Sequence, residues 1–454
     1  MNPRPLSDVA RAVEGVRLGA DVEVAAVTID SRLVTPGSLF VALPGSRTDG
    51  ARFVADAFAN GAAAALVAEG VPVAGPAVRV ASTGEALTRL AVDERARIRA
   101  SVVGVAGANG KTSTKDMAAA VLSSRFRTHA SPESFNNEIG LPLTLLGATP
   151  DVQVIVAEIG ARHVGDAADL CRIARPSIVV VTNVGVAHME IFGSWERIVE
   201  SSAEPIEAVE PDGVAILNAD DPVVTGHASR CRGRVVTFGA TGHAADVRAE
   251  RVLLRSDGLA TFELVHLNER AAVELTVAGD HMVPNAIAAA ALGITLGVDL
   301  AECAAALSTA TVSRWRMETF TTRAGVRVVN DAYNANPESM AAALKTARWM
   351  AGEGHLIAVL GAMAELGPIA PEAHERLGEL AARVRVDRLI VVGEDARSIA
   401  AAGVREGVEP ENAACYEDPE EALEDVRRTA RPGDVVLVKA SRVVGLERLA
   451  EALR

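Results

Sequence analysis

The feature that most constrains the fold of this chain is a series of short, uninterrupted apolar runs separated by helical stretches. Runs of this kind begin at residues 101, 152, 177, 213 and 234, and again at 326, 355, 387 and 433. Continuous apolarity, in place of alternation, is typical of strands buried on both faces, as in a parallel sheet covered by helices. The two series therefore predict two successive α/β units.

The first hundred residues have a different texture. Segment 21–45 reads as short strands joined by Pro and Gly turns, and segment 50–70 reads as a helix that runs into a further strand. At 454 residues the chain is long enough for three domains. We predict domain boundaries near residues 99 and 313, which gives domains 1–99, 100–313 and 314–454 in an α/β protein.

Composition and charge exclude several classes of function. The net charge of −14 repels polyanions, so we expect no nucleic-acid partner, although a local basic pocket could still bind one nucleotide. No apolar run is long enough to span a bilayer, and the N-terminus carries no apolar signal segment. The four cysteines are far apart and have no metal-binding spacing, which favours reduced thiols. We expect a cytoplasmic monomer.

The stretch VVGVAGANGKTSTKD, residues 102–116, places glycines, a lysine and a threonine directly after a predicted strand. Glycines let the backbone curl so that its N–H groups face phosphate oxygens, Lys111 adds a positive charge, and the Thr112 hydroxyl can bind Mg²⁺. The strict phosphate-loop pattern requires glycine at 105, where this chain has Val105, so the loop is a short variant. No Asn is followed by Lys, which argues against a GTPase.

Polar side chains follow three of the predicted strands at the point where each strand ends. These residues are Glu158, Asn183 with His188 five residues later, and Asn218. Open α/β sheets bind their ligands at the carboxyl ends of the strands. The convergence therefore indicates a ligand site, with Glu158 and His188 as candidates for a place near a metal ion.

Several motifs together resemble the Mur ligase family. GANGKTSTK, FNNEIGLPLT, EIGAR, NVGVAHMEIFGS, LNADDP, DAYNANPESM, AELG and VLVKASR occur in the order and spacing found in that family, over nearly the whole chain. The resemblance is greatest to members that add D-alanyl-D-alanine to a UDP-N-acetylmuramoyl-tripeptide. It implies a small UDP-binding α/β domain, a central ATPase domain with a mostly parallel sheet, and a C-terminal Rossmann-like domain.

The resemblance also implies a reaction. ATP would phosphorylate the terminal carboxylate of the nucleotide-linked tripeptide, and the dipeptide amine would attack the acyl phosphate to form an amide. The carboxylate, the triphosphate and the intermediate are all anionic, which suits a site rich in cations and N–H dipoles.

Site residues follow residue by residue from the matched motifs. Lys111, His188 and Arg316 would be catalytic. Thr112 and Glu158 would hold one Mg²⁺ and His188 a second. The resemblance assigns ATP to Gly107, Asn109, Gly110, Lys111, Thr112, Ser113, Asn285, Arg316, Asp331, Tyr333, Asn334 and Asn336, and the UDP-sugar peptide to Ser31, Arg32, Asn136 and Asn137. Because Arg316 and Lys111 fall in different predicted domains, we expect the domains to close on ATP.

One position departs from the family. In related ligases a carbamylated lysine helps to hold the second Mg²⁺, and the ungapped match places Ser202 there. A serine cannot form a carbamate, and Glu200 lies on a different face of the expected helix. Three interpretations stay open: a water molecule or the Ser202 hydroxyl completes the site, the chain is a sibling ligase with another carboxylate and amine, or it is a weak catalyst. A nucleotide-binding partner without ligase activity is the alternative from another class.

Overall fold

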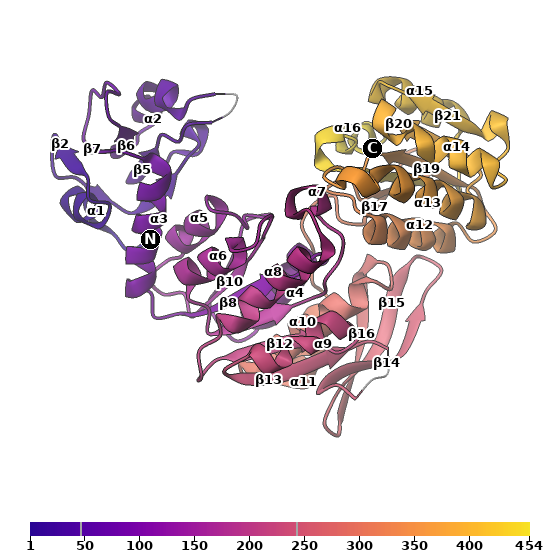
Figure 1. The fold of residues 1–454 in the computed structure, drawn as a ribbon, viewed down its shortest axis with the longest axis horizontal. Coiled ribbons are helices and arrows are strands. Elements are labelled where there is room, and N and C mark those ends of the chain that lie inside the picture. The colour runs from indigo at the N-terminus through magenta and orange to yellow at the C-terminus, as the bar shows by residue number, and fades with distance from the viewer. Residues whose placement is uncertain (46–47, 242–243) are drawn as a thin grey trace.

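The computed structural model describes residues 1–45, 48–241 and 244–454. Within these residues the strands form three large sheets that follow one another along the chain, and a further two-stranded pair lies within the N-terminal region. Figure 1 shows the N-terminal and C-terminal sheets on opposite sides of the central one. No helix in the described part of the chain is long and apolar enough to cross a membrane.

The N-terminal sheet has the order β2-β7-β6-β5-β4, in which the strands from β7 to β4 are parallel. Its strands are β2 (Val16–Leu18), β4 (Ala26–Thr28), β5 (Ser38–Val41), β6 (Ala64–Ala68) and β7 (Ala77–Val80). Strand β1 (Arg4–Pro5) pairs with β3 (Glu23–Val24). The helices are α1 (Leu6–Ala12), α2 (Val54–Ala59) and α3 (Thr83–Arg97), with 3₁₀ turns η1 (Ser31–Leu33) and η2 (Gly50–Phe53).

The central sheet has nine strands in the order β16-β15-β14-β13-β12-β11-β8-β10-β9. They are β8 (Ser101–Ala106), β9 (Thr128–Ala130), β10 (Val154–Glu158), β11 (Ile178–Val181), β12 (Val214–Asn218), β13 (Arg234–Gly239), β14 (Val247–Leu254), β15 (Leu259–His266) and β16 (Glu269–Ala278). The strands from β9 to β14 are parallel, and five of them, β8 and β10 to β13, are the predicted strands, whereas β9 was not predicted. The antiparallel extension β14–β16 was not predicted.

Helices cover both faces of the central sheet and connect its strands. They are α4 (Lys111–Ser123), α5 (Gly140–Gly147), α6 (Asp166–Ala174), α7 (Met189–Phe192), α8 (Trp195–Glu207), α9 (Pro222–Gly226), α10 (Met282–Thr295) and α11 (Leu300–Leu307), with the 3₁₀ turn η3 (Ala228–Arg230). Helix α10 is rich in alanine and buried along most of its length, and it packs against α4.

The C-terminal sheet has the order β17-β18-β22-β19-β20-β21, parallel except for β17. Its strands are β17 (Glu318–Thr321), β18 (Arg327–Asn330), β19 (Leu356–Gly361), β20 (Arg388–Val392), β21 (Ala413–Tyr416) and β22 (Val435–Lys439). Its helices are α12 (Pro337–Ala351), α13 (Ala370–Arg383), α14 (Arg397–Arg405), α15 (Pro419–Thr429) and α16 (Glu447–Glu451). The 3₁₀ turns are η4 (Gly367–Ile369), η5 (Glu394–Ala396), η6 (Pro410–Asn412) and η7 (Arg442–Val444).

The apolar cores are continuous across the three sheets. Val103 and Val105 of β8 lie in a cluster that extends into the C-terminal region as far as Leu437. On the other face of β8, Val102 lies in a cluster that reaches Leu6 in the N-terminal region. The alternation of side chains along one strand therefore ties the central sheet to both neighbours. The domain boundaries at 99 and 313 stay a prediction.

Candidate functional site

The loop between β8 and α4 has a backbone that only glycine can follow at two positions. Gly107 has φ of +130° and Gly110 has φ of +80°. A Cβ on Gly107 would lie 2.1 Å from Thr182 Oγ1, and one on Gly110 would lie 2.2 Å from Asn285 Oδ1. The loop therefore curls as a phosphate cradle does, against neighbours that leave no room for a side chain.

Lys111 begins α4 at the end of this loop. Its ammonium donates to the carbonyls of Gly107 at 2.7 Å and Ala108 at 3.1 Å. Burial lowers the pKa of Lys111, while the Glu158 carboxylate opposes that shift. Residues 108–110 of the loop and Lys111 at the N-terminus of α4 line one cavity, and this arrangement suits an anion such as a phosphate.

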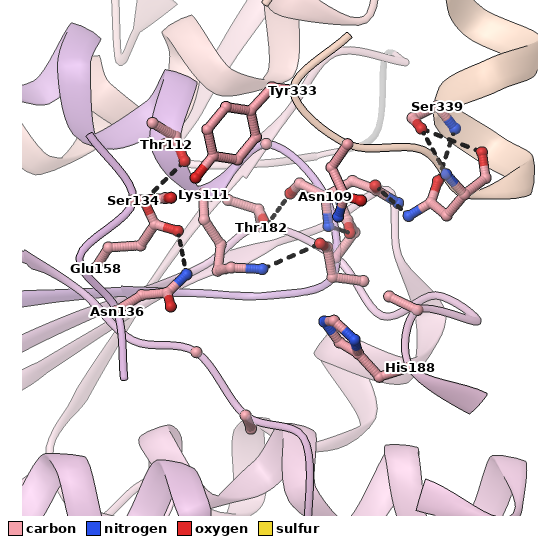
Figure 2. A pocket seen from close by; sticks show the side chains of 18 of the residues that line it. Asn109, Lys111, Thr112, Ser134, Asn136, Glu158, Thr182, His188, Tyr333 and Ser339 are labelled. Atoms are coloured by element: carbon pink, nitrogen blue, oxygen red, sulfur yellow. Dashed lines mark hydrogen bonds between the residues drawn. The ribbon is translucent and has the colours of Figure 1, made fainter. Parts of the chain in front are cut away.

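A chain of hydrogen bonds joins the start of α4 to the end of β10. Thr112 Oγ1 donates to Glu158 Oε2 at 2.8 Å, and Asn136 Nδ2 donates to Glu158 Oε1 at 2.8 Å. Figure 2 shows these side chains converging with Lys111. From the C-terminal region, Arg316 Nη2 donates to Thr112 Oγ1 at 2.7 Å. The adjacent hydroxyl and carboxylate oxygens are the hard donors that Mg²⁺ prefers, so this donor set fits that ion.

His188 lies across the cavity, at the start of α7. It adopts a left-handed backbone with φ of +58°, and its Nδ1 pairs with the Glu365 carboxylate. Arg162 pairs with the same carboxylate, so one side chain of the C-terminal region holds two of the central region. Burial lowers the pKa of His188.

Ser202 lies in α8, where its hydroxyl donates to Val199 O at 2.7 Å and lies 3.0 Å from His227 Nε2. Glu204 instead accepts from the backbone N–H groups of Gly165 and Ala168, at 2.6 and 3.0 Å. Among the described residues no group of three or more His, Cys, Asp or Glu side chains could hold a metal. The Ser202 hydroxyl is neutral, and His188 is already paired with Glu365. These two side chains therefore do not fit a second Mg²⁺.

The side chains predicted to contact the nucleotide from beyond the loop come from α10 and the C-terminal region. Asn285 is buried and accepts from Thr114 Oγ1 at 3.3 Å, and it lies beside Gly110. The Arg316 guanidinium lies over the Tyr333 ring at 4.2 Å. Asn336 Nδ2 donates to Asn109 Oδ1 at 2.6 Å, which makes a second contact between the C-terminal region and the loop.

Asp331 is already paired within its own region. Its Oδ2 lies 2.5 Å from Lys439 Nζ, and its Oδ1 accepts from the Met317 backbone N–H at 3.0 Å. Lys439 also donates to Asn334 O at 2.9 Å. The predicted nucleotide contacts of Asp331 and Asn334 stay predictions.

One cavity of about 1090 Å³ collects most of the predicted residues. Its lining includes Asn109, Gly110, Lys111, Thr112, Ser113, Asn136, Asn137, Glu158, His188, Asn285, Arg316, Asp331, Tyr333, Asn334 and Asn336. Ser31 and Arg32 are not in that lining and lie in η1 of the N-terminal region. There Arg32 bonds to Asp30 and lowers the pKa of that carboxyl to about 2. Asn137 Oδ1 accepts from the backbone N–H of Gly140, the first residue of α5, at 2.8 Å.

Sequence reasoning did not single out some residues of the site. Arg162 and Glu365 are inside the quoted motifs EIGAR and AELG, but no local pattern shows that they pair with each other. Thr182, which donates to Asn109 O at 2.6 Å, directly follows the buried strand β11 and carries no other signal. Lys439 ends β22 inside the quoted motif VLVKASR, but no local pattern shows that it pairs with Asp331. His227, the neighbour of Ser202, has none.

Comparisons with known families cover most of the chain. The Mur ligase family catalytic domain matches residues 23–103, the Mur ligase middle domain matches 105–293, and the Mur ligase glutamate ligase domain matches 315–442. A UDP-N-acetylmuramoyl-tripeptide–D-alanyl-D-alanine ligase of Mycobacterium tuberculosis is 43% identical, covering 94% of this chain and 91% of its own. The enzyme of that name from Bacillus subtilis is 34% identical, covering 100% and 99%.

Solved structures of MurF ligases have the same fold as this chain. MurF from Acinetobacter baumannii superposes with a TM-score of 0.87 at 29% identity, covering 100% of this chain and 99% of its own. The MurF ligase of Thermotoga maritima, solved in complex with ADP, has a TM-score of 0.80 at 30% identity, covering 94% and 96%.

Proposed function

The chain belongs to the Mur ligase family, and from that premise we propose that it is an ATP-dependent, ADP-forming ligase that joins D-alanyl-D-alanine to UDP-N-acetylmuramoyl-tripeptide in peptidoglycan precursor synthesis. The observation that carries the proposal is the cluster of Lys111, Thr112 and Glu158 with Arg316 closing over it. This cluster provides cationic groups for a triphosphate and a buried carboxylate for a metal in one place.

In the proposed reaction the terminal carboxylate of the tripeptide attacks the γ-phosphorus of ATP, and ADP leaves. Lys111 and the loop N–H groups hold the phosphate oxygens, and Arg316 approaches them from the opposite side. The dipeptide amine then attacks the acyl carbon of the acyl phosphate. The amine loses a proton, phosphate departs, and an amide remains. The side chains mainly position reactants and balance negative charge.

We propose Thr112 and Glu158 as the Mg²⁺ ligands. A bound Mg²⁺ would neutralise phosphate charge during transfer. Asn136 orients the Glu158 carboxylate through a 2.8 Å hydrogen bond, which fixes where that charge lies. The proposal places no step on a second metal, because Ser202 and His188 do not fit one.

The remaining substrate contacts extend the proposal. Asn285 would meet adenine, Tyr333 and Asn336 would lie along the nucleotide, and Asn136 and Asn137 would line the sugar-peptide path. Ser31 and Arg32 in η1 would meet the UDP end, outside the main cavity. We place the enzyme in the cytoplasm as a monomer, with UDP-binding, ATPase and Rossmann-like domains at 1–99, 100–313 and 314–454.

A sibling ligase that uses another carboxylate or amine is the second candidate. The observation that favours it is Ser202, whose hydroxyl bonds within α8 and lies beside His227. This arrangement differs from the carbamylated lysine of the resembling ligases, on the side of the cavity where the acyl group would react.

The test is ADP release with UDP-N-acetylmuramoyl-tripeptide and D-alanyl-D-alanine, each also omitted in turn, with mass spectrometry of the product. The proposal expects release that requires both substrates, and a product heavier by the dipeptide minus water. Release only with other carboxylate–amine pairs would favour the sibling ligase. Silence with all pairs, combined with nucleotide binding, would favour the binding protein without ligase activity.

A further inference from the structure

Residues 308–317 connect α11 to β17 of the C-terminal sheet, and the last five of them include Arg316. We call residues 313–317 the strap. Trp315 has φ of +60° and Met317 has φ of +53°, a left-handed conformation that is uncommon for side chains of this size. Such a backbone persists only where its surroundings hold it. Arg316 lies between these two residues and reaches Thr112.

Carboxylates hold the strap at alternate residues. The backbone N–H groups of residues 313, 315 and 317 each donate to one carboxylate: Ser313 to Asp116 at 2.7 Å, Trp315 to Glu318 at 3.2 Å and Met317 to Asp331 at 3.0 Å. Hydrogen bonds to charged acceptors are the strong ones. The strap is therefore fastened along its length, and the intervening Arg316 projects toward the phosphate loop.

Asp116 differs from the other two carboxylates because it belongs to the central region. Its Oδ2 accepts from both the backbone N–H and the hydroxyl of Ser313, at 2.7 and 2.8 Å. Its Oδ1 lies 2.7 Å from Lys115 Nζ, and its side chain is 15% exposed. Both carboxylate oxygens are thus engaged, which fixes the orientation of the group.

The same helix makes both contacts with the strap. Thr112, which accepts from Arg316, and Asp116, which holds Ser313, are four residues apart in α4 and lie on one face of it. Helix α4 begins at Lys111 of the phosphate loop. Both Ser313, at the start of the strap, and the Arg316 guanidinium are therefore held against α4, the helix that follows the phosphate loop.

We propose that Asp116 is a positioning residue for Arg316: by holding Ser313 against α4, it sets where the guanidinium meets the phosphate side of the nucleotide. This inference rests on the proposed ligase function for its kinetic consequence, but its structural content does not. Asp116 touches no reactant, and its effect passes through the strap.

The kinetic test compares Asp116→Ala with Asp116→Asn, which keeps one acceptor oxygen. For Asp116→Ala we expect kcat to fall about tenfold, because a charged hydrogen bond is lost, while KM for the tripeptide substrate stays within about twofold. Asp116→Asn should restore part of the loss. Ser313→Ala should reduce kcat less, and combined with Asp116→Ala it should add nothing. Asp299→Asn, an exposed carboxylate at the start of α11, is the control.

A second readout does not depend on turnover. The chain has three tryptophans, Trp195, Trp315 and Trp349, so Trp195→Phe with Trp349→Phe leaves Trp315 of the strap as the reporter. In that background Asp116→Ala should increase acrylamide quenching of Trp315 at least about twofold, because the freed strap exposes its ring more often. If folding fails, Ser313→Ala gives the same comparison in a milder form.

The outcomes separate this inference from the proposed function. A wild-type protein that shows no substrate-dependent ADP release would refute the ligase, and the quenching comparison would still decide the role of Asp116. Unchanged quenching and unchanged kcat in Asp116→Ala would overturn the positioning role. A loss confined to the KM of the tripeptide would also overturn it, because the strap faces the nucleotide.

Discussion

The two sides of the cavity around Lys111 satisfy their polar groups in different ways. On the phosphate side, Thr112 and Glu158 bond to each other, and Arg316 joins them from the C-terminal region. On the opposite side, His188 pairs with Glu365. Ser202, which bonds within its own helix, lines a smaller pocket that Lys111 and His188 also line. The first side combines a hydroxyl and a carboxylate that suit a hard cation, whereas the Glu365 carboxylate on the second side is already paired with His188 and Arg162. The position that departs from the family, Ser202, and the unexpected pairing of Arg162 with Glu365 thus both lie near His188.

The largest effect should come from the phosphate side. Lys111→Ala should lower kcat/KM about a thousandfold, equivalent to about 4 kcal/mol, because it removes the cation nearest the loop. Steady-state ADP release measures this loss. Lys111→Arg, which keeps the charge but not the shape, is the matched control. Near-normal turnover in Lys111→Ala would contradict the proposal that the side with Lys111 binds the phosphates.

A smaller effect on the same side should come from Glu158→Gln. The amide keeps the shape but loses the charge that would hold Mg²⁺, so we expect turnover to fall about a hundredfold and the Mg²⁺ concentration for half-maximal rate to rise. The measurement is ADP release across a Mg²⁺ titration. Asp151→Asn, an exposed site before β10, should change neither value. An unaltered Mg²⁺ dependence in Glu158→Gln would contradict the assignment.

On the opposite side, the segment carrying Glu365 should be sensitive to acid. His374 Nε2 accepts from the Met363 backbone N–H at 2.9 Å, so the ring is neutral there, and burial lowers the pKa of His374. The unfolded chain therefore binds more protons as pH falls through about 6.5, and this contribution to stability is full above that pH and lost below it.

Thermal unfolding between pH 7.5 and 5.5 checks this expectation. Each unit of pKa depression corresponds to about 1.4 kcal/mol. The fall in Tm on acidification should therefore be shallower in His374→Gln than in the wild type. His163→Gln, at an exposed ring, should retain the wild-type slope. Equal slopes in all three proteins would show that His374 does not couple to folding.

The smallest effect should come from Ser202. Ser202→Lys, assayed with added bicarbonate, should raise turnover or leave it unchanged if this side merely lacks an anionic ligand. Glu200→Lys adds a lysine two residues away on another face of α8 and is the control. A collapse of turnover confined to Ser202→Lys would mean that this side of the site depends on the contact between Ser202 and His227. The side would then be built differently from the phosphate side, and would not simply lack one ligand.

Local patterns in the sequence predict the phosphate loop and the polar ends of the strands, whereas Asn285, Arg316 and Tyr333 were assigned only from the family resemblance. Glycine at 107 and 110 marks the loop because the backbone there has positive φ. Glu158 is marked by its position at the end of the buried strand β10. The pairing of Arg162 with Glu365 joins residues 203 positions apart, and no periodicity encodes it. The carboxylates that hold the strap act on backbone N–H groups, which carry no sequence signature.

Only some strands of the central sheet could be predicted from the sequence. The parallel strands were predictable because both of their faces are buried, which leaves continuous apolar runs. Strands β14, β15 and β16 alternate buried with more exposed residues and bear many charges, so they resembled neither series. Their place at the edge of the sheet follows from tertiary pairing.

Strand β8 has one face in each of the two largest apolar clusters and leads directly into the loop before Lys111. Each of these clusters also extends into an outer region of the chain, so removing either region would expose apolar surface that the intact molecule buries. We therefore expect excised pieces of this enzyme to aggregate, and the intact molecule to melt as a unit.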